Sequence, residues 1–319
     1  MKLKVRKRKI KSLKKRIQVT VMVVFIYLLW TMACRGQMHF GPTEPETDIC
    51  KYLSETDVDD LKKVDLDDLT QADYDIIFAQ TGVGRAGIET LVENDELSEL
   101  ENIQDYYYGK ANIYESRYNV IRHQERVSGV YKDKEKLDPH FIVEDGDILV
   151  TLSSYVGGWR YDHTGLVVDA KAGTVLEAMD YGEPSVFRRL GHWREYPAFA
   201  ILRPKDLSEE ERAAVAEYAY DNLENVDYGL LSTTKVREVG KGDSIENIQL
   251  ANELGIKLNS DVIEHTQCAH IVWYAYYLAG IDLSDKYSVL VTPADILQDD
   301  DLELVMEYGF RPDIFQGRR

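Results

Sequence analysis

Cysteine is scarce in this sequence, and its scarcity excludes one class of fold. Only three Cys occur among 319 residues, too few for the several disulfides that stabilise small secreted domains. Cys34 and Cys50 can pair with each other only if Cys34 carries no lipid. Cys268 is then left without an expected disulfide, so packing or chemistry has to explain its position.

Basic residues are scarce outside the first 16 positions. Residues 1–16 hold ten of the 38 Lys and Arg and no acid, so 28 basic residues face 56 acidic ones in the rest of the chain. Such an acidic body repels nucleic acid and anionic lipid. The composition therefore argues against a nucleic-acid partner, and membrane topology explains the basic tail better than DNA binding does.

Long hydrophobic runs are absent except for one, at residues 17–33. With the basic cytoplasmic tail before it, this run has the pattern of an export signal. About 17 apolar residues are just enough to span a bilayer, which favours an uncleaved signal anchor over 17–34. The alternative is a lipoprotein whose lipid is carried by Cys34, after a poor processing box at 31–34. Both predict a domain tethered to the cell membrane and lying outside the cytoplasm.

Two stretches follow the apolar run. Residues 35–56 are interpreted as a linker because 41–47 is polar and rich in proline. Residues 57–140 are expected to be a helical region. Its first stretch, 57–69, has paired Asp residues, but it lacks the glycine and closing glutamate of a calcium-binding EF-hand loop.

Tyrosines are clustered in this helical region. Tyr106, Tyr107 and Tyr108 are followed by Tyr114 and Tyr118. Aromatic residues at helical spacing are typical of a core. They are also compatible with a groove for sugars or acyl chains, and the pattern does not separate the two.

A glycine motif at Gly82, Gly84 and Gly87 resembles the phosphate-binding turn of dinucleotide enzymes. It follows the apolar stretch 74–79, as such a turn does. However, residues 93–105 are acidic and helical in pattern, so no second buried strand supplies the acid that holds a ribose. The motif favours close backbone packing of helices instead.

Cys268 opens an apolar helix that runs to Gly280. A thiol on the first turn of a helix faces unpaired backbone N–H groups and the positive end of the helix dipole, and both favour the thiolate. Cys268 is therefore a candidate nucleophile. The alternative is that it is a small buried apolar residue, which is the more common role of a single Cys in a helix.

A nucleophilic thiol needs a base and a group that orients the base. The sequence predicts strands over 146–152, 163–168 and 174–178, with a hairpin at 171–173 between the last two. His163 opens the second strand, and Glu177 lies near the end of the third. Antiparallel pairing would bring these side chains together across the ladder.

Several segments, in order, carry a resemblance to a known family. They are Gly146-Asp147-Ile148, His163 to Val168, Val175 to Ala178, Trp193, Phe199 to Arg203, Asp227-Tyr228, the Cys268 helix and Pro293 to Leu297. This series resembles the permuted papain-like cysteine hydrolases, in particular the YiiX/YebB-like branch of the NlpC superfamily. The resemblance covers residues 141 to 300, about half the chain.

The resemblance implies an α+β, circularly permuted papain-like domain over 141–315, with a small antiparallel sheet packed on the Cys268 helix and an N-terminal helical region before it. It also implies roles. His163 is the base and acid, Cys268 the nucleophile and Glu177 the orienting carboxylate. Tyr228 is expected near the substrate. Gln267, which the resemblance does not supply, is a candidate donor to an oxyanion beside the backbone N–H of Cys268. No metal or organic cofactor is implied.

The chain departs from the family at Gln267, where an aromatic residue is usual, and at Ala269-His270, where Ser-Glu is usual. The first expectation for its function is a membrane-tethered cysteine hydrolase that cleaves an amide bond, such as a cell-wall peptide bond. A lipid-directed acyl hydrolase or acyltransferase, and an inactive module that binds peptide or glycan, are the alternatives.

Overall fold

The computed structural model describes residues 2–33, 45, 47–55, 69–109, 114–118, 122–127, 140–156, 159–160, 162–233, 244–258, 263–284, 289–310 and 315. Its helices are α1 (Lys2–Ala33), α2 (Ile49–Glu55), α3 (Gln71–Thr81), α4 (Arg85–Glu93), η3 (Leu97–Glu99), α5 (Leu100–Gly109), η5 (Leu190–Glu195), α6 (Glu209–Asn222), α7 (Ile245–Leu254), α8 (Cys268–Leu278) and α9 (Pro293–Gln298).

Its strands are β1 (Tyr114–Tyr118), β2 (Arg122–Val127), β3 (Ile148–Thr151), β4 (Ser154–Val156), β5 (Trp159–Arg160), β6 (His163–Asp169), β7 (Thr174–Glu177), β8 (Val186–Arg189), β9 (Phe199–Pro204), β10 (Asp227–Tyr228), β11 (His265–Thr266) and β12 (Leu302–Tyr308). The chain is therefore α+β, as expected from the sequence.

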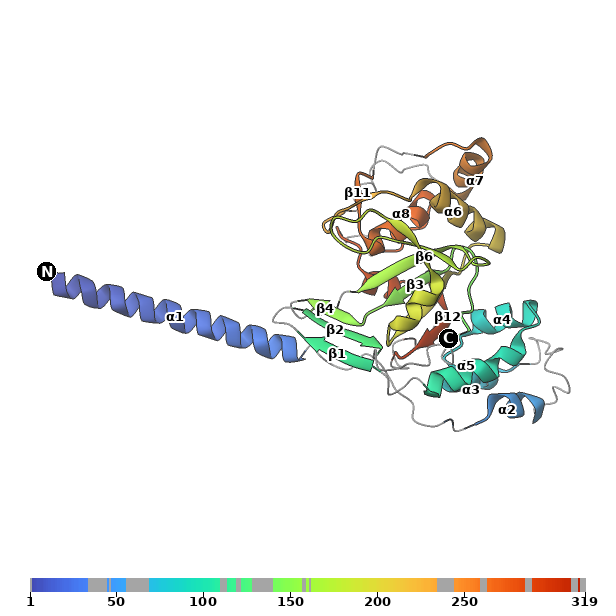
Figure 1. Ribbon diagram of the computed structural model, residues 1–319, viewed down its shortest axis with the longest axis horizontal. Coiled ribbons are helices and arrows are strands. Elements are labelled where there is room, and N and C mark those ends of the chain that lie inside the picture. Colours follow the sequence, from blue (N-terminus) through green and yellow to red (C-terminus); the bar gives the residue numbers. More distant parts are fainter. Residues whose placement is uncertain are drawn as a thin grey trace.

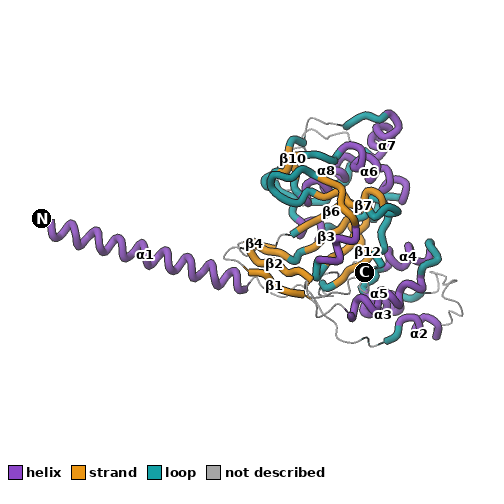
Figure 2. Tube along the Cα trace, viewed as in Figure 1, coloured by secondary structure: helices purple, strands orange, loops and turns teal. Residues whose placement is uncertain are grey.

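Six strands form the central antiparallel sheet, in the order β12-β9-β3-β6-β7-β8. Side chains alternate between its two faces. Ile148 and Val150 join a core that includes α6 and α8, whereas Leu149 joins a core that includes α3, α4, α5 and η5. Helices therefore cover both faces of the sheet (Figures 1 and 2), which explains why its strands are mostly buried, with the edge strand β8 as the exception.

The strands predicted around His163 are confirmed as β3, β6 and β7, paired antiparallel. The hairpin between β6 and β7 turns at Gly173, which adopts the left-handed conformation at φ +64°. Ser208 and Glu211 form a capping box, the local signal of a helix start, at the beginning of α6. Local sequence chemistry thus sets the strands and the helix that surround the site.

The prediction of a helical region over 57–140 is wrong at residues 114–118 and 122–127. The structure has helices α3 to α5, but β1 and β2 follow and form a second antiparallel sheet, in the order β1-β2-β4-β5. Tyr114 and Tyr118 misled the interpretation because residues four apart share a face in a strand as well as in a helix. Residues 56–68, including most of the acidic stretch, lie outside the described residues.

The predicted linker over 35–56 also contains a helix, α2. Ile49 and Leu53 are fully buried and lie one helical turn apart on the same face. They belong to the core formed with α3 and α5. The linker prediction relied on the polar, proline-rich composition of 41–47 and so missed the short apolar face that begins at Ile49.

The glycine motif packs against a strand and not around a phosphate. The Gly84 N–H donates to the Val305 carbonyl at 2.9 Å, and a Cβ at Gly82, Gly84 or Gly87 would lie within 2.3 Å of a β12 carbonyl oxygen. The predicted close backbone packing is therefore confirmed, although its partner is β12 instead of a helix.

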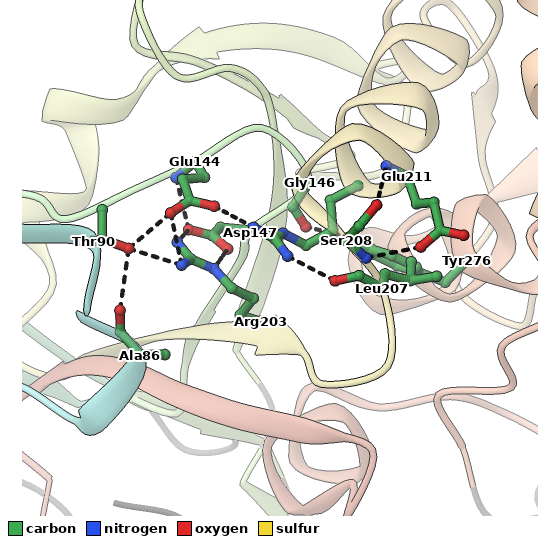
Figure 3. Close-up of polar contacts among 11 residues, drawn as sticks. Ala86, Thr90, Glu144, Gly146, Asp147, Arg203, Leu207, Ser208, Glu211 and Tyr276 are labelled. Atoms are coloured by element: carbon green, nitrogen blue, oxygen red, sulfur yellow. Dashed lines mark hydrogen bonds and ion pairs between the residues drawn. The ribbon is translucent and has the colours of Figure 1, made fainter. Parts of the chain in front are cut away.

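A buried charged cluster ties the start of β3 to β9 and α6 (Figure 3). Arg203 donates to both carboxylate oxygens of Asp147 at 2.8 Å and lies 2.8 Å from Glu144. Arg212 of α6 also pairs with Glu144. Thr90 of α4 bonds both Arg203 and Glu144, so the cluster joins elements from both faces of the sheet.

Within the described residues, no helix is both long enough and apolar enough to cross a membrane. The tether through residues 17–33 stays a prediction, although these residues belong to α1, which stands apart from the rest of the protein in Figure 1. Cys34, the alternative lipid-bearing residue, lies outside the described residues.

Candidate active site

Cys268 is the first residue of α8 and is almost completely buried, with 4% of its surface exposed. Gln267 caps the helix, because its Oε1 accepts the Ala269 N–H at 2.9 Å. The Cys268 Sγ lies 3.4 Å from the same Oε1 and 3.6 Å from the carbonyl oxygen of Asp162. The sequence thus places the thiol at a helix start and beside the residue that precedes His163.

His163 and Glu177 meet across the β6–β7 hairpin. Leu166 pairs with Leu176 in this ladder, so Glu177 lies diagonally across from His163, within reach of a long side chain. Glu177 Oε2 is 3.2 Å from His163 Nε2, and the two side chains are 0% and 5% exposed. This is a buried ion-pair contact without the geometry of a directed hydrogen bond.

Each member of this pair stabilises the charged form of the other. Burial lowers the pKa of His163, but the Glu177 carboxylate and the interaction with Cys268 outweigh burial and raise the pKa to about 10. Burial would raise the pKa of Glu177, but His163 and the Trp193 N–H lower it. Because Nε2 faces Glu177, Nδ1 is the imidazole nitrogen left for the Cys268 thiol.

Trp193 completes the surroundings of Glu177, and the sequence did not reveal this role. Its Nε1–H donates to Glu177 Oε1 at 2.7 Å, and its ring stacks on His163 with centroids 5.5 Å apart. Arg188 adds a positive charge 3.7 Å from Glu177 Oε2. Trp193 belonged to the series that carried the family resemblance, but only the fold brings η5 against the hairpin.

Of the two predicted substrate residues, Gln267 directly precedes Cys268, and Tyr228 lies on a strand that pairs with the residues just before Cys268. Tyr228 of β10 pairs with Thr266 of β11, two residues before the nucleophile. The Gln267 Nε2 donates to the Val291 carbonyl at 2.7 Å, so its amide caps α8 on one side and holds a loop on the other. These contacts assign Gln267 to supporting the helix start.

His270 lies apart from the Cys268–His163 pair, as its spacing in the helix predicts. Its Nδ1 is 3.1 Å from Thr266 Oγ1. Burial lowers the pKa of His270 to about 4, so the ring is neutral near pH 7. It packs among the aromatic rings of α8, including Trp273.

The described residues contain no cluster of three or more His, Cys, Asp and Glu side chains that could hold a metal ion. A cavity of about 260 Å³ lies at the end of α6 and is lined by Tyr218, Asp227 and Tyr274, among others. None of the three candidate active-site residues borders this cavity.

Comparisons with protein-family models, with curated proteins and with solved structures find no match to this chain. The resemblance to permuted papain-like hydrolases therefore stays a prediction from the ordered residues. The geometry around Cys268, His163 and Glu177 is an independent observation on the same residues.

Proposed function

We propose that this chain is a cysteine hydrolase that cleaves an amide bond through a thioester, on a circularly permuted papain-like domain. One observation supports the proposal most: a buried Glu177–His163 pair interacts with a cysteine at the first residue of a helix, whose sulfur lies 3.6 Å from the carbonyl oxygen of Asp162, the residue before His163. A thiol, a base and a group that orients the base are what nucleophilic catalysis by cysteine requires.

The reaction proceeds in two halves. His163 takes the Cys268 proton, the sulfur attacks the carbonyl carbon, and the backbone N–H at the start of α8 stabilises the oxyanion. His163 then gives the proton to the departing amine, leaving an acyl thioester on Cys268. Water, deprotonated by His163, attacks this thioester and releases the acid and the free thiol. Glu177 keeps the imidazole in its working orientation throughout.

The substrate class proposed first is a peptide amide of the cell wall. A domain tethered to the membrane through residues 17–33 and held outside the cytoplasm would meet that polymer. The acidic body disfavours nucleic acid as a substrate, and an uncharged or cationic peptide suits it better.

Turnover of purified cell wall, followed as newly released amino groups, tests this proposal. The full chain should release them, whereas Cys268→Ala and His163→Ala should release none while retaining their thermal unfolding transition. Cys50→Ala is the matched control, because it removes a thiol of α2 and should leave the activity unchanged. Full activity in Cys268→Ala would refute the assignment.

A lipid-directed acyl hydrolase is the second candidate, and one observation favours it. Leu230 and Leu231 are 56% and 73% exposed. They directly follow Gly229, whose N–H donates to the Thr266 carbonyl at 2.7 Å, next to the start of α8. Free fatty acid released from phosphatidylcholine vesicles, without amine release from cell wall, would support this candidate. Neither product would favour an inactive binding module.

A further inference from the structure

Trp193 contacts both members of the buried pair at once. It is 0% exposed, its Nε1–H bonds Glu177 Oε1 at 2.7 Å, and its ring stacks on the His163 imidazole at an interplanar angle of 17°. A carboxylate has two oxygens, and this bond occupies the one that does not face His163. The indole therefore fixes the plane of the carboxylate and covers one face of the imidazole.

The space for this arrangement comes from Gly165, which lies between His163 and Leu166 on β6. A Cβ at this position would lie 3.3 Å from Glu177 Cγ and 3.3 Å from Trp193 Cζ2, and 2.5 Å from Val175 Cγ1. The side chains of Glu177 and Trp193 therefore both pack directly over the backbone of Gly165. The strand leaves room for the indole to reach the pair.

We propose that Trp193 is a positioning residue for the Cys268–His163 pair. Its N–H holds Glu177 so that Oε2 points at His163, and its ring keeps the imidazole from turning away from the thiol. This inference rests on the proposed function, since it concerns the same nucleophile and base. A hydrogen bond to a charged group is among the stronger polar contacts in a protein interior, so its loss should be measurable at Cys268.

Trp273 provides a matched control within the same domain. It too is 0% exposed, and its Nε1–H also donates to a carboxylate oxygen at 2.7 Å, that of Asp282. Asp282 does not pair with His163. Trp193→Phe and Trp273→Phe therefore remove the same kind of bond from equally buried indoles, one bonded to the fully buried Glu177 at the candidate active site and one to the partly exposed Asp282.

The experiment is alkylation of Cys268 by iodoacetamide in the full chain between pH 5 and 9, quantified at that residue by peptide mass spectrometry. We expect Trp193→Phe to slow alkylation at pH 5 to 6 about tenfold, which equals a displacement of the acid side of the profile by about one pH unit. Trp273→Phe should stay within about twofold of the parent. Replacing the Trp193 indole by benzothiophene, which keeps the shape and lacks the N–H, should reproduce the displacement in a chain that folds.

Each contrary outcome has its own meaning. An unmoved profile in both the Trp193→Phe and benzothiophene chains, or equal slowing in Trp273→Phe, would overturn the positioning role. His163→Ala separates this failure from failure of the proposed function. If His163→Ala abolishes the fast reaction at low pH while the Trp193 changes do not, only the positioning role is wrong. If His163→Ala leaves the alkylation profile unchanged, both the activated Cys268–His163 pair and the positioning role of Trp193 are wrong.

Discussion

Two buried charged clusters lie on the same sheet, and they differ in what their partners can do. Around Asp147, both carboxylate oxygens are bonded by Arg203, whose charge does not change in the physiological range. Around Glu177, the partner is an imidazole, which can lose and regain a proton and also interacts with a thiol. The first cluster is saturated by a fixed charge, whereas the second has a partner that can exchange a proton.

This difference separates a structural cluster from a reactive one better than burial does. Both carboxylates are 0% exposed. Burial would lower the pKa of Arg203, but Asp147 and Glu144 outweigh it and raise it further, so the guanidinium acts as a fixed charge. Among the described residues of the two clusters, only the Glu177 cluster lies beside a cysteine thiol, that of Cys268. Changes at the two clusters should therefore separate folding from chemistry.

The largest effect should come from breaking the saturated cluster. Arg203→Met leaves Asp147 buried without its cation, and loss of one partner of a buried ion pair costs about 3–5 kcal/mol. Urea unfolding should show this loss in the free energy of unfolding. Glu253→Gln, an exposed carboxylate on α7, is the control, with an expected change of about 0.5 kcal/mol or less. A change below about 1 kcal/mol for Arg203→Met would show that the cluster is not structural.

The next effect should appear in activity. Glu177→Gln keeps the shape but removes the charge that holds His163, so turnover should fall about 10²–10³-fold, within the range that general acid–base catalysis contributes. The folded fraction, checked by circular dichroism, should remain near that of the parent. Turnover within about threefold of the parent would contradict the orienting role of Glu177.

The smallest effect should appear in the pH dependence of stability. The raised pKa of His163 stabilises the fold below its unfolded value of about 6.5, and this contribution is lost as pH rises toward 10. The lowered pKa of Glu177 stabilises the fold above about 4.5, and this contribution is lost as pH falls below it. The pair therefore contributes most between about pH 5 and 6.

Tm of the parent minus Tm of Glu177→Gln should peak in that window and decline on both sides by about 2–4 °C. The subtraction cancels the contribution that other buried acids make to the pH dependence of Tm. One such acid is Glu307, whose pKa is raised to about 8 by burial. A difference that stays constant with pH would mean that His163 and Glu177 do not form an ion pair.

Local patterns predicted the parts of the fold and site that depend on neighbours in sequence. Two apolar runs with a hairpin at 171–173 between them predicted β6 and β7, and antiparallel pairing predicted that Glu177 lies near the imidazole. The start of an apolar helix at Cys268 was equally visible. These features follow from residue periodicity and capping chemistry, which a sequence carries directly.

Features that depend on long-range packing could not be predicted. Trp193 reaches Glu177 only because η5 folds against the hairpin, and Gly165 matters only because two side chains cross it. Arg203 and Asp147 are 56 residues apart, and nothing local indicates that they pair. Tyr114 and Tyr118 led to a wrong prediction of a helix, because a spacing of four residues fits the periodicity of a strand as well as that of a helix.

The most direct test of the account is the rate of Cys268 alkylation between pH 5 and 9 in the full chain, with and without His163→Ala. The account predicts a parent rate that is nearly constant from about pH 7 to 9 and falls only below about pH 6. In His163→Ala the rate should instead rise about tenfold per pH unit until roughly pH 8.5, the ordinary behaviour of a free thiol. A parent profile that already rises in this way, unchanged by His163→Ala, would contradict an activated cysteine–histidine pair.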